Sequence, residues 1–460
     1  MRRVSLAEAS RYWFQLGWIS FGGPAGQIAL MHQELVERRR WLSERRYLHA
    51  LNYCMVLPGP EAIQLATYLG WLMHGVRGGL VAGGLFLLPS VIVLIALSTI
   101  YVLWGQLPLL AAVFWALKPA VLAIVVQAGW RLGRRTLHTQ PLVLLAVFAF
   151  LAFSVLQWPY PLVIALAALA GWAAGRWQPA WLALPQPQAP VFAVQNPSPQ
   201  NPIAETSAGD DIPRDFIHGD ATPTPAHARF SKRHLALTLL VWGCALGLPL
   251  LALGLINGWD GPLVAMGRFF SQVALVTFGG AYAVLPYVAK AAVGHFDWLS
   301  ASQMVDGLAL GETTPGPLII VVAFVGFMGG WNTGVFGAPG HWWDAVAATL
   351  VVVWFTFLPS FGFILVGGPL VEATRDNLRL GAPLRAITAA VVGVIGSLVL
   401  FFAAPVLWPA GQFDWAPAGL VLLALVLLLR WRWSVLQLIG GAALVGLGRY
   451  GLAQLGQLIG

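Results

Sequence analysis

Charged residues are scarce in this chain, making up 10% of its 460 residues, against roughly 25% in soluble domains. Hydrophobic residues account for 58%, and the mean hydropathy is +0.75. This composition excludes an ordinary soluble domain. It predicts an all-α polytopic membrane protein, because helices satisfy their own backbone polar groups within lipid.

Cysteine is also rare, and the two cysteines, Cys54 and Cys244, lie far apart in apolar segments. They give no support to a disulfide or a cysteine metal site. The histidines show no ligand-like spacing with a carboxylate, and no nucleophile stands beside a base, so no cofactor is expected. A membrane-embedded enzyme is therefore the less favoured class. The net charge of +8 is better explained by membrane orientation than by nucleic-acid binding.

Apolar runs long enough to span a bilayer recur along the chain. A helix needs about 17–25 apolar residues to span. The long runs are 78–103, 108–130, 235–256, 344–370 and 386–406, and shorter paired runs are 141–157 with 159–176 and 417–430 with 433–457.

A three-part motif is written twice. Phe21-Gly22-Gly23 is followed by Trp41-Leu42-Ser43 and then by Pro58-Gly59-Pro60. The same three motifs return, each 257 positions later, ending in Pro315-Gly316-Pro317. Leu-Pro-Ser then occurs at Pro89 and again at Pro359, now 270 positions apart, so about 13 residues are inserted around 331–343. Such repetition indicates two homologous halves.

A polar segment divides these halves. It is rich in Pro, Gln, Ala and Ser, a composition typical of a flexible tether. The predicted domains are an N-terminal repeat at 1–177, a hydrophilic cytoplasmic linker at 178–232, a connecting transmembrane helix at 233–257 and a C-terminal repeat at 258–460.

Basic residues are distributed oppositely in the two halves. The connection 31–48 holds five arginines, whereas its counterpart 288–301 holds only Lys290 against Asp297. Conversely, 371–385 holds three arginines and its counterpart 104–118 only Lys118. Because basic loops are cytoplasmic, the two repeats are predicted to be inverted in the membrane, as in many secondary transporters.

The number of crossings indicates re-entrant elements. Placing 31–48 and 131–135 on one side requires an even number of crossings, yet three apolar segments lie between them. The segment with Pro58-Gly59-Pro60 in its middle is predicted not to cross, since proline breaks the helix, and the Phe-Gly-Gly segment is predicted to enter and return as well. The alternative, in which all thirteen segments cross, leaves five arginines outside.

Four broken helices near the membrane midplane would form an anion site. Irregular backbone at that depth must be buried or line a cavity, and a helix restarting after proline points free N–H groups into it. The alternative is that these glycines and prolines only permit kinks and close packing. The predicted substrate-binding residues are Phe21, Gly22, Gly23, Gln27, Pro58, Gly59, Pro60 and Gln64 in the first half and Thr277, Phe278, Gly279, Gly280, Thr313, Thr314, Pro315, Gly316 and Pro317 in the second.

Four ionisable residues complete the candidates. Intramembrane carboxylates are costly and by default functional, so Glu61 and Glu312 are candidates for proton coupling, although Glu61 could equally cap a helix. Lys118 and Arg385 stand at matching places and could attract the anion or simply extend to the interface.

The doubled motifs, the Leu-Pro-Ser that follows and the polar tether resemble the long-chain chromate ion transporter family. The resemblance implies a multi-pass protein of the bacterial inner membrane that exports chromate and confers chromate resistance, with sulfate as a competing analogue. A sulfate or other oxyanion importer of the same fold is the alternative. The expected partners are the oxyanion and the lipid bilayer, without nucleic acid, and a homodimer remains open.

Overall fold

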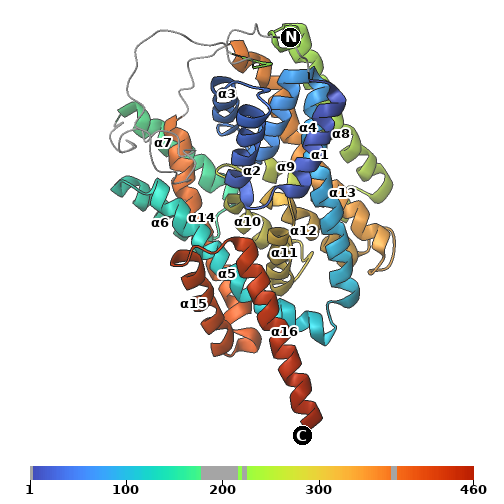
Figure 1. Cartoon of the computed structure of the whole chain (residues 1–460), viewed down its shortest axis with the longest axis vertical. Helices are drawn as coiled ribbons and strands as arrows, with labels where there is room; N and C mark the ends of the chain where they lie inside the picture. Colours follow the sequence, from blue (N-terminus) through green and yellow to red (C-terminus); the bar gives the residue numbers. More distant parts are fainter. Residues whose placement is uncertain (1–3, 178–215, 220–224, 374–380, 460) are drawn as a thin grey trace.

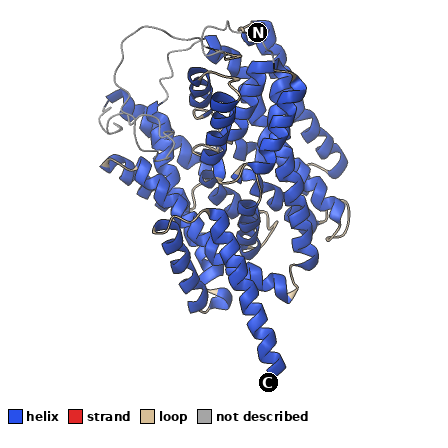
Figure 2. Cartoon of the chain, in the orientation of Figure 1, coloured by secondary structure: helices blue, strands red, loops and turns tan. Residues whose placement is uncertain are grey.

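The computed structural model describes residues 4–177, 216–219, 225–373 and 381–459. These residues form sixteen α-helices and, within this part of the chain, no strand (Figures 1 and 2). Six helices are long and apolar enough to cross a membrane. The predicted all-α polytopic membrane fold is confirmed. Most of the predicted linker, and Arg375 and Arg379, lie outside the described residues.

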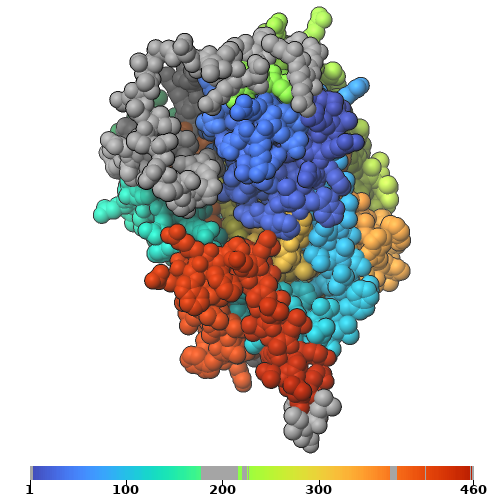
Figure 3. All heavy atoms as spheres, viewed as in Figure 1, coloured from blue at the N-terminus to red at the C-terminus, as the bar shows by residue number. Residues whose placement is uncertain are grey.

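The first half contains seven α-helices. In the view of Figure 3, its first helices (blue) lie in the upper part of the face, and its cyan segments lie lower, beside the red helices at the end of the chain. Its elements are α1 (Leu6–Ile19), α2 (Gly23–His32), a π-helical turn (Gln33–Arg38), α3 (Glu44–Cys54), α4 (Glu61–Trp104), α5 (Pro108–Thr136), α6 (Gln140–Ser154) and α7 (Tyr160–Trp177).

The second half repeats this order after a connecting helix. α8 (Lys232–Asn257) occupies the predicted connecting span. The repeat then comprises α9 (Pro262–Val276), α10 (Ala281–Lys290), a π-helical turn (Ala291–His295), α11 (Ala301–Thr313), a 3-10 turn (Leu318–Ile320), α12 (Val321–Thr333), α13 (Trp342–Ala373), α14 (Gly381–Leu407), α15 (Trp415–Leu429) and α16 (Val435–Ile459).

The chain doubles back at each Phe-Gly-Gly motif. After α2, the Arg39 guanidinium lies 5.1 Å from the ring centre of Tyr12 in α1, and Trp41 lies 5.6 Å from the same ring. After α10, Trp298 likewise returns to within 5.9 Å of Phe270 in α9. Both motifs are therefore the tips of helical hairpins.

The chain doubles back at Pro-Gly-Pro as well. In the second half, Asn332 at the end of α12 donates to the carbonyl of Trp298 just before α11, at 2.8 Å.

A further turn follows in the first half, inside α4. The helix turns sharply at His74 and Gly75, where Gly75 adopts a φ of 65°. The arm that starts at Glu61 packs closely against the following arm, because Gly70 faces Gly78.

These hairpin helices are too short to span. α1, α2 and α3 contain 14, 10 and 11 residues, about 15–21 Å at 1.5 Å per residue, whereas the hydrocarbon core is about 30 Å thick. Each of these helices is thus shorter than a full span, and re-entrance of the motif tips stays a prediction.

The two halves run in opposite directions. At one end of the molecule, Tyr53 of α3 donates to the carbonyl of Phe363 in α13 at 3.0 Å. At the other end, Trp342 at the start of α13 donates to Thr99 near the end of α4 at 2.9 Å. The second arm of α4 and α13, which carry the matched Leu-Pro-Ser motifs, are thus antiparallel. Figure 1 accordingly places α3 toward the N-terminal end and α11 in the opposite half.

The described part of the linker docks on the arginine-rich connection. His218 forms an isolated bridge with Leu42, and its carbonyl accepts from the Ser43 N–H at 3.2 Å. Burial, followed by the charge of Arg46, lowers the pKa of His218 to about 4. The ring is therefore neutral near pH 7, and this contact does not depend on protonation there.

Candidate functional site

The motif tips of the two halves bond to each other reciprocally. The Gly59 N–H donates to the carbonyl of Thr277, and the Gly316 N–H donates to the carbonyl of Ser20, both at 2.7 Å. Gly59 matches Gly316, and Ser20 matches Thr277, in the sequence repeat. Each Pro-Gly-Pro tip is thus held by the residue before the Phe-Gly-Gly of the other half, which brings the four breaks together as predicted.

The central glycines have distinct roles. Gly59 and Gly316 have φ values of 123° and 109°, and an added Cβ at either would overlap a serine hydroxyl of the opposite half. Gly22 and Gly280 also have positive φ, but an added Cβ there would meet nothing within 4 Å. The Pro-Gly-Pro tips therefore lack room for a side chain, and the Phe-Gly-Gly tips face open space.

Helix starts at the site lack side-chain caps. Ser43 and Ser300 cap α3 and α11, each accepting from the backbone N–H three residues further on, those of Arg46 and Gln303. The starts of α5, α8 and α9 have no side-chain cap. The central starts, after Gly22, Pro60, Gly280 and Pro317, have no side-chain cap. Their free N–H groups and dipoles favour a negative charge.

Two buried glutamines hold the tips. Gln27 donates through Nε2 to the carbonyl of Gly316, and Gln64 donates to the carbonyl of Pro58 at 2.6 Å. Both side chains are fully buried, and both Oε1 atoms lack a partner among the described residues. Gln27 and Gln64 therefore lie at the crossing of the motif tips, and substrate binding by them stays a prediction.

The threonine hydroxyls point elsewhere. Thr277 donates to Val273, and Thr313 and Thr314 both donate to Leu310, at 2.6–2.7 Å. A hydroxyl has one hydrogen, so in this state these groups donate to their own helices. The site contribution of Thr277 is its carbonyl.

The carboxylate candidates differ in their surroundings. Glu312 in α11 accepts from the hydroxyl of Tyr282 in α10, which joins the two hairpins of the second half beside Pro-Gly-Pro. Glu61 is the first residue of α4, directly after Pro60, and is partly buried. Its place at a helix start keeps both the capping and the coupling interpretation open.

The two cationic candidates lie on α5 and α14. Lys118 donates to Ser302 at 2.6 Å and lies 3.5 Å from the Asp306 carboxylate. Arg385 is the fifth residue of α14, which packs on α6 and α7. The ammonium group of Lys118 therefore binds residues of α11 rather than a motif tip.

Lys118 instead lines a polar cavity of about 470 Å³ between α4, α5 and α11. Tyr101 donates to Asp306 at 2.9 Å in its wall, and the second carboxylate oxygen of Asp306 lacks a partner among the described residues. None of the motif-tip residues is in the lining of this cavity, so it is separate from the central site.

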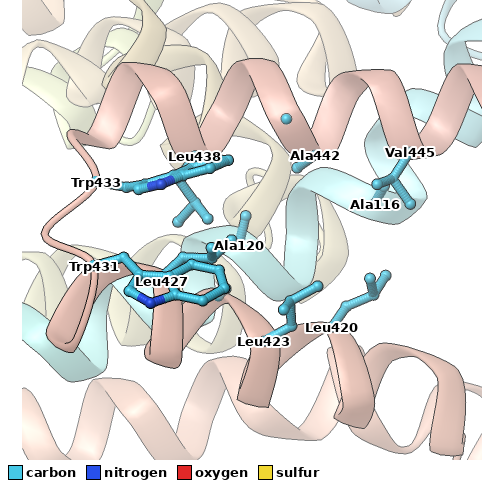
Figure 4. Close-up of a pocket in the computed structure, with 12 residues that line it drawn as sticks. Ala116, Ala120, Leu420, Leu423, Leu427, Trp431, Trp433, Leu438, Ala442 and Val445 are labelled. Atoms are coloured by element: carbon cyan, nitrogen blue, oxygen red, sulfur yellow. The ribbon is translucent and has the colours of Figure 1, made fainter.

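A second cavity is apolar. It occupies about 300 Å³ between α5, α15 and α16, where Trp431 and Trp433 face each other across it (Figure 4). Alanine and leucine side chains form the rest of its wall. The two indole N–H groups are the polar groups of this otherwise apolar lining.

The sequence prediction missed two site residues. Ser90 and Ser360 end the matched Leu-Pro-Ser motifs, and they lie against Gly316 and Gly59 respectively. The recurrence of that motif was the available signal, but only the packing of α4 against α13 shows which tip each serine meets.

The doubled arrangement matches a known family. The chain fits the family model described as chromate transporter over residues 7–172 and 264–447, one match in each half. The chain belongs to the chromate transporter family. The predicted resemblance is thereby confirmed.

Three related transport proteins match this chromate transporter over most of their own length. It is 28% identical to a chromate transport protein of Cupriavidus metallidurans, covering 97% of this chain and 94% of that protein. It is 31% identical to a chromate transport protein of Pseudomonas aeruginosa, covering 86% and 81%. An uncharacterized transporter of Methanocaldococcus jannaschii is 23% identical over 91% of this chain and 88% of that protein. No solved structure matches.

Proposed function

We propose that this chain exports chromate from the bacterial cytoplasm through the site where the four motif tips meet, and so confers chromate resistance. The observation that carries this proposal is that the uncapped helix starts after Pro60 and Pro317 directly follow the two glycines that bond reciprocally to the opposite half. Backbone dipoles stabilise a dianion without a fixed cation that would trap it. The transport proteins related to this chain support chromate as the substrate.

The proposed orientation places the linker and the arginine-rich connection in the cytoplasm. The docking of His218 on Leu42 puts these two segments at the same end, and the positive-inside rule then assigns that end to the cytoplasm. The Pro-Gly-Pro hairpin of the first half enters from this side, and that of the second half enters from outside.

Cysteine labelling tests this orientation. In a background without Cys54 and Cys244, Arg45→Cys is expected to resist an impermeant thiol reagent in whole cells, and His295→Cys is expected to react. Both positions are exposed in the structure, so accessibility to the reagent depends on the side of the membrane. Reaction of both variants in whole cells contradicts the inverted arrangement. The arrangement is also contradicted if neither variant reacts in whole cells although both react after the cells are permeabilised.

The direction of transport is tested in inside-out membrane vesicles. Chromate uptake, which corresponds to export from cells, is expected above that of vesicles lacking the protein, and sulfate is expected to compete. Uptake only in right-side-out vesicles assigns import instead. Sulfate uptake that chromate leaves unchanged assigns the alternative substrate.

Glu312 is expected to tune transport rather than to drive it. Glu312→Gln retains a hydrogen-bond acceptor for Tyr282 but cannot ionise, so the pH profile of chromate uptake should flatten while potential-driven uptake persists. Tyr282→Phe is the matched variant that removes the bond and keeps the carboxylate. Loss of all uptake in Glu312→Gln at every pH, with normal insertion, assigns Glu312 obligatory coupling.

A further inference from the structure

Two buried serine hydroxyls at the motif crossing are left without partners. Ser90 is 0% exposed and Ser360 is 1% exposed, and neither Oγ has a hydrogen-bond partner among the described residues. Thr356, one turn before Ser360, instead donates to the carbonyl of Val352 at 2.7 Å. Thr67 and Ser98 on α4 are also buried without a hydroxyl partner among the described residues, but only Ser90 and Ser360 stand at matched places of the sequence repeat. A buried hydroxyl without a partner is unfavourable.

Both hydroxyls face the tip of the opposite half. A Cβ added at Gly59 would lie 2.5 Å from Ser360 Oγ and 2.7 Å from Gln64 Nε2, and a Cβ added at Gly316 would overlap Ser90 Oγ. Each hydroxyl therefore stands against the glycine that precedes an uncapped helix start. Ser90 directly follows Pro89 in α4. Proline has no backbone N–H, so it cannot donate the regular helical hydrogen bond at that position.

We propose that Ser90 and Ser360 are a pair of oxyanion ligands, each donating its hydroxyl hydrogen to the substrate in the central site. This inference rests on the proposed function. A tetrahedral dianion has two-fold symmetry, so it can lie on the pseudo-two-fold axis between the halves and accept one serine hydrogen from each. The helix starts after Pro60 and Pro317 supply further N–H donors from the same two directions.

The proposal explains why neither hydroxyl bonds to its own helix. A serine in a helix can donate to the carbonyl four residues earlier, as Ser271 in α9 does to Gly267 at 2.7 Å. Ser90 and Ser360 keep their hydrogens available instead, and the substrate takes them when the tips separate from the long helices. Binding at this contact therefore accompanies parting of the two halves, which alternating access requires.

Alanine substitution tests the assignment in the full-length protein. Ser90→Ala and Ser360→Ala are each expected to raise the chromate KM in membrane vesicles by about tenfold to a hundredfold, the range for a hydrogen bond to a charged group. The double variant should show a larger rise than either. Thr356→Val, which removes an equally buried hydroxyl that bonds to its own helix, should leave KM near that of the parent protein.

Thermal stability of the purified variants separates binding from structure. Removing an unpartnered hydroxyl is expected to leave the apparent Tm unchanged or to raise it. A rise in KM with an unchanged or higher Tm supports the proposal, whereas a lower Tm that parallels the loss of uptake assigns the serines a structural role and overturns it. An unchanged KM in the double variant overturns this inference alone. Absence of saturable chromate or sulfate uptake by the parent protein overturns the proposed function and this inference together.

Discussion

Replacing Gly316 by leucine is expected to abolish chromate transport, and Gly59→Leu is expected to do the same. Both glycines have φ values above 100°, a region that other residues occupy only with strain. A side chain at either position would also displace a serine hydroxyl of the opposite half. The two effects act at the contact that joins the halves, so uptake in membrane vesicles should fall to background.

The matched control is Gly84→Leu. Gly84 lies within the second arm of α4, has no positive φ, and faces open space, where an added Cβ meets nothing within 4 Å. It is expected to insert and transport normally. Insertion of all three variants is measured by their amount in the membrane fraction. Normal transport by Gly316→Leu and Gly59→Leu would mean that the tips are only structural kinks.

Dissipating the membrane potential is expected to produce the other large effect. Moving one charge through 100 mV changes the free energy by about 2.3 kcal/mol, so a dianion gains about 4.6 kcal/mol when an inside-negative potential drives it outward. That difference corresponds to roughly three orders of magnitude in the equilibrium distribution. The contacts that join the motif tips are made by backbone and glutamine amide groups, which suits uniport of a dianion.

The measurement is chromate uptake into inside-out vesicles at a constant pH gradient, with and without an ionophore that collapses the potential. Uptake is expected to fall strongly when the potential is removed and to recover when an imposed ion gradient restores it. An unchanged rate would show that the potential does not drive the cycle and that a titrating group carries the coupling.

The repeat made much of this architecture predictable. The doubled motifs predicted two halves, and the helix-breaking Pro-Gly-Pro predicted a chain reversal that the contact of Asn332 with Trp298 shows directly. The inserted residues near 331–343 correspond to the connection between α12 and α13, where the first half has only the tight turn at His74 and Gly75. These features follow from local sequence, because glycine and proline set backbone geometry wherever they stand.

The site was less predictable because its contacts join distant segments. Nothing in the spacing shows that Gly59 bonds to Thr277 rather than to Ser20 of its own half. Nor does spacing show that Lys118 pairs with Asp306 across the halves, away from the motif tips. Such pairings depend on how α4 and α13 pack against each other. Polar residues near a motif therefore identify the region, and tertiary packing decides which atoms face the ligand.

The most direct test of the central claim is chromate flux through the purified protein in liposomes. Liposomes carrying this protein are expected to take up chromate under an imposed interior-positive potential, with sulfate as a competitor. Liposomes carrying Gly316→Leu or no protein should show only leak. Equal uptake by all three preparations would contradict the account, because it would mean that the crossing of the motif tips is not a path for an oxyanion.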